Sequence, residues 1–114
     1  MRLLTEISDD YKQQFQVTTE DNKVFTLSLE YMPNQQSWFF SLAYNNFSLN
    51  GQRLVLDPSL LRRFIAYLPF GMACICDDPQ VDPFLLDDFK SGRIKLYTMT
   101  LDEVTQLEKT LYEI

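Results

Sequence analysis

The feature that most limits the fold of this chain is an alternation of apolar and polar residues with a period of two. In residues 24–31 the alternation separates an apolar face from a polar one: Phe25, Leu27, Leu29 and Tyr31 against Thr26, Ser28 and Glu30. Successive side chains of a β-strand point to opposite faces, so this pattern predicts a half-buried antiparallel strand. Residues 37–44 repeat the alternation, with an inner face of Trp38, Phe40, Leu42 and Tyr44.

Short polar segments between the alternating runs predict turns. The segment EDNK at 20–23 and the segment MPNQQ at 32–36 are both rich in turn-forming residues. Asn50-Gly51 is the strongest local signal, because both residues tolerate the positive φ that a two-residue hairpin turn requires. We therefore expect a tight hairpin turn at Asn50-Gly51.

Two segments change to a helical period. In residues 57–68, Asp57 suits the N-cap, Pro58 suits the first helical position and Pro69 ends the helix. Its apolar residues recur at helical spacing: Leu60, Leu61, Phe64, Ile65 and Leu68. A second helix is predicted at about 101–113, where Thr100 and Glu103 form a capping box before an apolar stripe of Leu101, Val104, Leu107, Leu111 and Ile114.

These elements predict a mainly β fold of the α+β class. We expect an antiparallel sheet with one internal helix and a C-terminal helix against it, and the pattern leaves open whether the sheet curls into a small barrel. Residues 71–78 and 93–100 supply further strands. A chain of 114 residues fits one domain, so residues 1–114 are expected to form a single unit.

The side chains that enzymes and metal sites use most are scarce. The chain has no histidine, which removes the commonest general base and the commonest zinc ligand. Its two cysteines, Cys74 and Cys76, lack further ligands for a zinc site and read as reduced, small core residues. Three glycines form no phosphate-binding loop. We expect no enzyme activity, no metal or other cofactor and no small-molecule substrate.

The charge balance argues against two further classes of partner. A net charge of −6 disfavours binding to a phosphate backbone, which rewards clustered lysine and arginine. No run approaches the length of a membrane-spanning helix, and the N-terminus lacks the apolar core of a signal peptide. We therefore expect a protein made in the cytoplasm that binds neither nucleic acid nor membrane.

Residues 31–52 hold no charged side chain, although 23% of the chain is charged. Charged groups are depleted at the centres of protein interfaces, because removing them from water is costly. Phe39 breaks an otherwise small and polar face, so it is either covered by a second layer or meets a partner. The predicted interface set is Phe39, Asn45, Asn46, Asp87 and Asp88, and the predicted structural set is Trp38, Phe40, Leu42, Gly51, Leu96 and Tyr97.

The aspartates of the interface set belong to a longer acidic segment. It contains Asp77, Asp78, Asp82, Asp87 and Asp88. The spacing does not match a calcium loop, which alternates its ligands around a central glycine and ends in glutamate. A solvated acidic loop is the plain interpretation, and a docking surface for a basic partner is the sharper one.

The order of these features resembles a known family. The similarity covers roughly residues 12–97, through FTLSLEYMPNQQSWFFSLAYNN, LNGQRLVLDPSLL, PFGMACI and SGRIKLYTM. The residues that carry it are Tyr31, Trp38, Leu42, Gly51, Leu54, Leu60, Leu61, Gly71, Asp82, Gly92, Arg93, Leu96 and Tyr97. Together they are similar to the baseplate plug family of contractile-tailed bacteriophages, and the motifs are structural, not catalytic.

The resemblance implies a structural virion protein of the tail baseplate, made in the host cytoplasm. It would occupy or close the central hub or tail lumen before contraction, with other baseplate hub proteins as partners. The alternative hypothesis is a small acidic cytoplasmic module, an adaptor or inhibitor, that docks a basic protein through its acidic loop.

Overall fold

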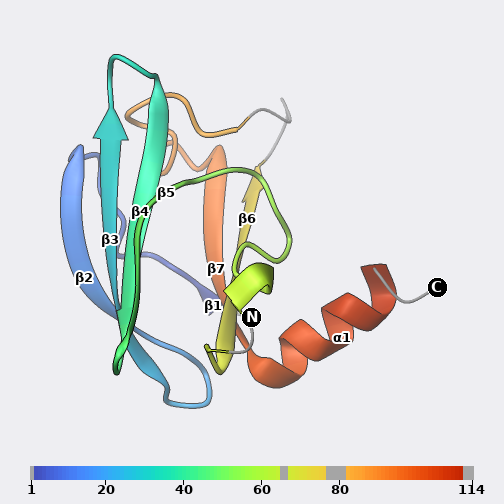
Figure 1. Cartoon of the computed structure of the whole chain (residues 1–114). Helices are drawn as coiled ribbons and strands as arrows, with labels where there is room; N and C mark the ends of the chain where they lie inside the picture. Colours follow the sequence, from blue (N-terminus) through green and yellow to red (C-terminus); the bar gives the residue numbers. More distant parts are fainter. Residues whose placement is uncertain (1, 65–66, 77–81, 112–114) are drawn as a thin grey trace.

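The computed structural model describes residues 2–64, 67–76 and 82–111. In these ranges the chain forms seven strands, a 3₁₀ turn and one α-helix (Figure 1). The elements are β1 (Arg2–Leu3), β2 (Lys12–Thr18), β3 (Val24–Met32), β4 (Ser37–Tyr44), β5 (Phe47–Arg53), η1 (Arg62–Phe64), β6 (Phe70–Cys76), β7 (Ile94–Thr100) and α1 (Leu101–Leu111). The prediction of a mainly β, antiparallel fold is confirmed.

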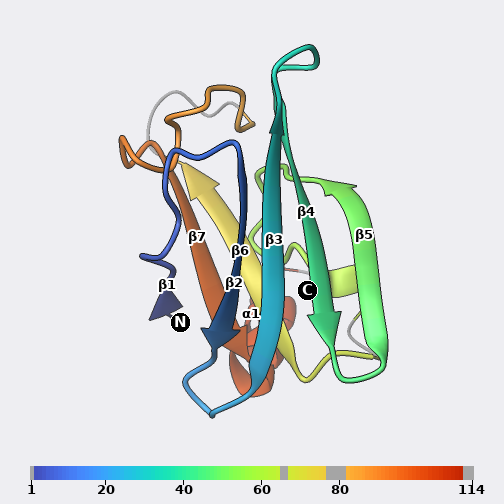
Figure 2. The ribbon, with the colours of Figure 1, turned by 90° about the vertical axis from the view of Figure 1, so that its left-hand side faces the viewer.

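The strands form two sheets rather than one curled barrel. One sheet has the order β2-β3-β4-β5 and the other β1-β7-β6, and every pairing is antiparallel. The two sheets pack face to face, as Figures 1 and 2 show from two directions. The segment after β5 touches β6 through an isolated bridge between Asp57 and Cys74.

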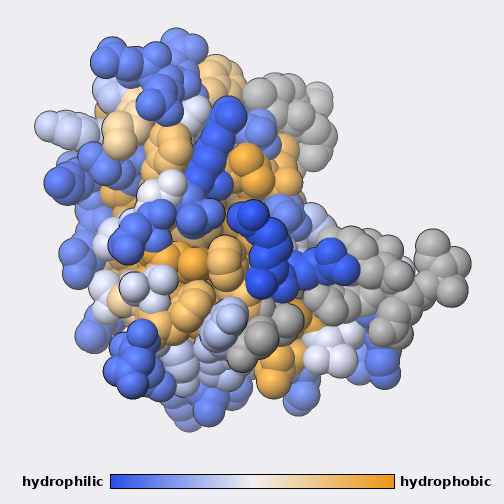
Figure 3. All heavy atoms as spheres, in the orientation of Figure 1, coloured by the Kyte–Doolittle hydropathy of each residue, from blue (hydrophilic) through white to orange (hydrophobic). Residues whose placement is uncertain are grey.

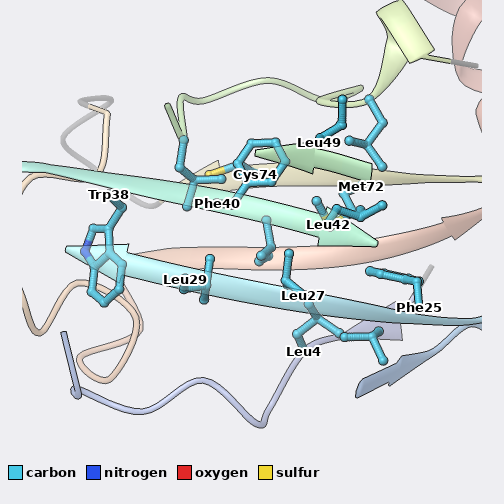
Figure 4. Close-up of a cluster of buried hydrophobic side chains, with 14 of the residues drawn as sticks. Leu4, Phe25, Leu27, Leu29, Trp38, Phe40, Leu42, Leu49, Met72 and Cys74 are labelled. Atoms are coloured by element: carbon cyan, nitrogen blue, oxygen red, sulfur yellow. The ribbon is translucent and has the colours of Figure 1, made fainter. Parts of the chain in front are cut away.

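The core lies between the sheets and uses the predicted inner faces. Figure 4 shows Leu27 and Leu29 of β3 and Leu42 of β4 pointing into the layer that Met72 of β6 also fills. The rings of Phe25 and Phe70 stack across the two sheets, with centroids 4.2 Å apart. In the structural set, the side chains of Trp38, Phe40, Leu42 and Leu96 are buried, and Tyr97 is half-buried on the other side of its sheet.

Asn50-Gly51 does not form the predicted hairpin turn. The chain reverses earlier, at Asn45-Asn46, and Asn50-Gly51 lies within β5 as a β-bulge opposite Ser41. Gly51 has φ of +63° and its N–H donates to the Ser41 hydroxyl, 3.1 Å away. Such a bulge needs the same positive φ as a tight turn. Asn50-Gly51 therefore does mark a position of positive φ, but the prediction of a hairpin turn there is wrong. Gly51 is therefore exposed and lies outside the core.

The internal helix shortens to η1, a three-residue 3₁₀ turn. The segment before it is held by β6, because Leu60 N–H donates to the Met72 carbonyl at 2.7 Å and Asp57 N–H to the Cys74 carbonyl at 3.0 Å. The Asp57 carbonyl, which would accept the first hydrogen bond of a helix capped at Asp57, instead accepts the Cys74 N–H at 2.9 Å, so the predicted α-helix does not begin there. Asp57 still accepts a hydrogen bond from Ser59 N–H, 2.8 Å from its Oδ1. Ile65, part of the predicted stripe, lies outside the described residues.

The C-terminal helix α1 forms as predicted and packs on the outer face of β6 and β7 (Figure 1). The capping box is confirmed, because Thr100 N–H donates to Glu103 Oε1 and Glu103 N–H donates to the Thr100 hydroxyl. Val104 is buried together with Met99 and Ala73, and these three residues form a second, smaller core between α1 and the sheet. The predicted end near residue 113, and Ile114 of the stripe, lie outside the described residues.

Candidate interaction surfaces

The acidic segment is built into the structure rather than simply solvated. Asp88 is 1% exposed, and its Oδ2 accepts backbone N–H donors of Phe84 and Leu85, each at 2.8 Å. Arg93 binds the same carboxylate with Nε 2.9 Å from Oδ1 and Nη2 2.8 Å from Oδ2. Asp88 thus organises a loop, and its side chain is not presented to a partner, contrary to its place in the predicted interface set.

The environment of Asp88 favours its charged form. Burial by itself raises the pKa of this carboxyl, but the hydrogen bonds from Arg93 and from the Leu85 and Phe84 amides outweigh it and lower the pKa below 3.8. The Arg93 guanidinium is held on its other side by the ring of Phe84, 5.0 Å from its centroid. The pair is therefore a fixed structural element.

The loop of residues 82–93 closes one end of the sandwich. Trp38 Nε1 donates to the Leu85 carbonyl at 2.9 Å, and the Tyr31 hydroxyl donates to the Phe84 carbonyl at 2.7 Å. Asp82 Oδ1 accepts the N–H of Leu56, which ties the loop to the segment after β5. Of the remaining acidic residues, Asp87 is exposed, and Asp77 and Asp78 lie outside the described residues.

Phe39 lies on the outer face of the four-stranded sheet, the face toward the viewer in Figure 2. Its half-buried ring borders an open hollow of about 700 Å³. The hollow is lined by Lys12, Gln13, Gln14, Ser28, Leu29, Glu30, Met32, Gln35, Phe39, Ser41, Asn50 and Gly51. Lys12 and Glu30 face each other across the β2–β3 pair, so the lining carries no net charge. In the described part of the chain no second layer covers this face.

Asn45 and Asn46 lie at the opposite end of β4 from Phe39, in the exposed β4–β5 turn. Six positions along a strand span roughly 20 Å, so the structure does not bring them together with Phe39. They line a second, shallow hollow with Tyr44, Phe47 and Tyr67. Tyr67 is 64% exposed and was missed at the sequence level, since its helical context gave no reason to single it out.

The cysteines are placed for packing rather than for chemistry. Both are buried in β6, and neither is part of a disulfide among the described residues. Burial, followed by the nearby charges of Asp82, Cys76 and Asp57, raises the pKa of the Cys74 thiol to about 12. A thiol with that pKa stays protonated at neutral pH and is a poor nucleophile and metal ligand.

The described residues offer neither a metal site nor a membrane-spanning helix. They contain no group of three or more His, Cys, Asp or Glu side chains placed to hold a metal ion. Within the same residues no helix is long and apolar enough to cross a membrane.

A family model described as cyanophage baseplate Pam3 plug gp18 matches residues 2–102 of the chain. The chain belongs to this baseplate plug family. The match confirms the resemblance and identifies a structural protein of the phage virion, located in the tail baseplate, where it contacts other baseplate or tail proteins. No curated protein matches the chain.

The structure explains most of the plug-like residues as parts of the scaffold. Gly51 makes the bulge, Arg93 holds Asp88, and Trp38 anchors the 82–93 loop. Gly71 leaves room for the helix, because a Cβ placed there would lie 2.5 Å from Cγ2 of Val104. The match to the plug family ends at residue 102, within the first turn of α1, so most of this helix lies beyond it.

Proposed function

We propose that this protein acts as a baseplate plug that occupies or closes the central hub or tail lumen before contraction. The observation that carries the proposal is the family match over residues 2–102. We further propose that residues 1–114 work as one plug domain, through protein–protein contacts alone and without catalysis.

The contact with a neighbouring hub subunit is assigned to the Phe39 face. Three properties support this assignment: the face is open in the described part of the chain, its lining has no net charge, and Phe39 stands among hydroxyl and amide side chains. Apart from Lys12 and Glu30, the lining residues are uncharged, and uncharged side chains cost less to desolvate than charged ones, so the face suits a stable contact inside an assembly.

The alternative, an acidic module that docks a basic protein, is less well supported. It relied on Asp87 and Asp88 as a charged surface. Asp88 is buried and neutralised by Arg93, and Asp82 is used by the backbone of Leu56. Among the described aspartates of the acidic segment, Asp87 alone keeps an exposed side chain, and a single exposed carboxylate is a weak basis for recognition.

The test is the position of the protein in a reconstruction of the intact virion, together with an assembly experiment. Phe39→Ser should leave the isolated protein folded by circular dichroism but reduce its incorporation into baseplates. Ile75→Ser is the matched control, because Ile75 is also an apolar residue accessible to solvent but lies on the other sheet. Density outside the hub, or normal incorporation of Phe39→Ser, would argue against the assignment.

A further inference from the structure

A second surface, with the opposite electrostatic character, lies along the side of the sandwich where the chain passes from β5 to β6. We call it the arginine–aromatic surface: Arg53, Arg62, Arg63, Phe64, Phe47 and Tyr67. Its central hollow, of about 330 Å³, is bordered by the three arginines and by Gln52, Ser59 and Asp57 among others. Figure 3 shows strongly hydrophilic side chains gathered over the region of η1, beside apolar ones.

The charge of this surface is unusual for the chain. The protein has a net charge of −6 and only ten basic residues, yet three of them border one hollow. Asp57, the one carboxylate in the lining, accepts a hydrogen bond from Ser59 N–H. Among the described residues no carboxylate forms an ion pair with Arg53 or Arg63. Arg53 and Arg63 thus bring two guanidinium groups to a hollow whose lining holds one carboxylate.

A row of rings adjoins the arginines. The Arg63 guanidinium lies 5.3 Å from the centroid of the Phe64 ring, which lies 6.1 Å from that of Phe47. The Phe47 and Tyr67 rings stack nearly parallel, at 5.0 Å and 6°. The row has Arg63 at one end and the largely exposed Tyr67 at the other. Because these side chains already contact one another, they lose little conformational freedom when a partner binds.

These groups select a particular kind of partner. A guanidinium binds a carboxylate through two parallel hydrogen bonds, and an exposed aromatic ring packs against an apolar or aromatic side chain. A phosphate backbone is the weaker match, because it rewards a long run of cations and would be repelled by an acidic protein. Charge complementarity therefore points to an acidic protein segment.

We propose that the arginine–aromatic surface binds an acidic segment of a neighbouring baseplate subunit, with a carboxylate on Arg53 and Arg63 and an apolar or aromatic side chain on Tyr67. The identity of the neighbour rests on the proposed function. Arg53 stands opposite Phe39 in the β4–β5 register, so this surface adjoins the Phe39 face. In one interpretation of the sequence, an acidic loop of this chain binds a basic partner. In the proposed contact the charges are reversed, because this chain supplies the cations and the partner the carboxylates.

The first experiment does not depend on the proposed function. The full chain is titrated with the peptide acetyl-Asp-Glu-Phe-Glu-Asp-amide and followed by NMR, with the Asn/Gln version of the peptide as control. We expect saturable shifts at Arg53, Arg63 and Tyr67 for the acidic peptide, weakened about tenfold by Arg53→Gln with Arg63→Gln. Absence of these shifts, equal shifts with the neutral peptide, or tighter binding of a DNA duplex at the same residues would overturn the proposal.

The second experiment tests the neighbour. Baseplates are assembled from purified subunits with the arginine double variant, and Lys23→Gln with Lys109→Gln serves as a control of equal charge change, because neither lysine lines a surface assigned to a partner. The proposal is supported if the arginine variant alone fails to incorporate and if incorporation of the wild type falls as the salt concentration rises. Equal incorporation of both variants overturns it. Failure of the wild type to incorporate would instead count against the proposed function. If the free chain forms concentration-dependent dimers that the arginine variant abolishes, the partner is a second copy of this chain, and the proposal of a different neighbouring subunit is wrong.

Discussion

Arg93 donates hydrogen bonds to both carboxylate oxygens of Asp88, with Nε 2.9 Å from Oδ1 and Nη2 2.8 Å from Oδ2. The Asp88 side chain is 1% exposed and that of Arg93 is 14% exposed, so water screens the pair little. Two backbone amides complete the coordination of the carboxylate. The pair fixes the 82–93 loop, on which Trp38 and Tyr31 depend for their hydrogen-bond acceptors.

Asp88→Asn should lower the free energy of unfolding by on the order of 3 kcal/mol, because it removes the buried carboxylate charge that binds the largely buried Arg93 guanidinium. Urea-induced unfolding measures the loss. The neighbouring Asp87→Asn is the control, and it should change stability by less than about 0.5 kcal/mol because Asp87 is exposed. Equal effects of the two substitutions would contradict the structural role of Asp88.

The same pair predicts an acid dependence of stability. The pKa of Asp88 is lower in the folded chain than the ordinary 3.8, so the unfolded chain binds the proton first as the pH falls. The stabilisation is present in full above the unfolded pKa and is lost as the pH drops through the folded one. Unfolding measured from pH 6 downwards should show a shallower decline in Asp88→Asn than in the wild type. Parallel declines would show that other groups dominate.

Gly51→Ala should destabilise the protein by about 1 kcal/mol through backbone strain alone. The residue has φ of +63°, and a Cβ there would meet no atom within 4 Å, so steric overlap makes no contribution. Gly51→Asn should cost less, because asparagine adopts this conformation more readily than alanine does. Thermal unfolding of the two variants checks the order, and a smaller loss for alanine would rule out the strain explanation.

Gly71→Ala should destabilise the protein for the opposite reason, by about 1–3 kcal/mol. The added Cβ would lie 2.5 Å from Cγ2 of Val104 and 3.3 Å from Cε of Met99. Because Val104 lies in α1, this overlap would push the helix away from the sheet. In the double variant with Val104→Ala, the combined loss should be smaller than the sum of the two single losses. Additive losses in urea unfolding would mean that α1 moves away without resistance.

Trp38→Ala should remove about 3–5 kcal/mol of stability, since the ring is fully buried and contacts Phe89 of the closing loop. Trp38→Phe keeps much of the ring volume but loses the donor to the Leu85 carbonyl. It should cost less, at about 1–3 kcal/mol. Hydrogen exchange at the 82–93 amides should rise in Trp38→Phe; protection equal to wild type there would contradict the anchoring role.

The period-two pattern by itself determined the strands and their inner faces, since alternation along a strand is a local property of the backbone. The pairs Phe25–Leu27 and Trp38–Phe40 were buried as expected for that reason. The capping box of Thr100 and Glu103 is likewise local, and it formed as predicted.

Tertiary structure decided the features that depend on partners distant in sequence. Asn50-Gly51 became a bulge because Ser41 and β4 continue beside it, and the segment from Asp57 did not form the predicted helix because β6 binds the Asp57 carbonyl. Asp88 reads as one more acidic surface residue until the fold buries it against Arg93. Arg53 and Arg63 gather into one surface only when β5 and η1 meet. A sequence states which charges a chain contains, but the fold decides which are neutralised inside the molecule and which remain for a partner.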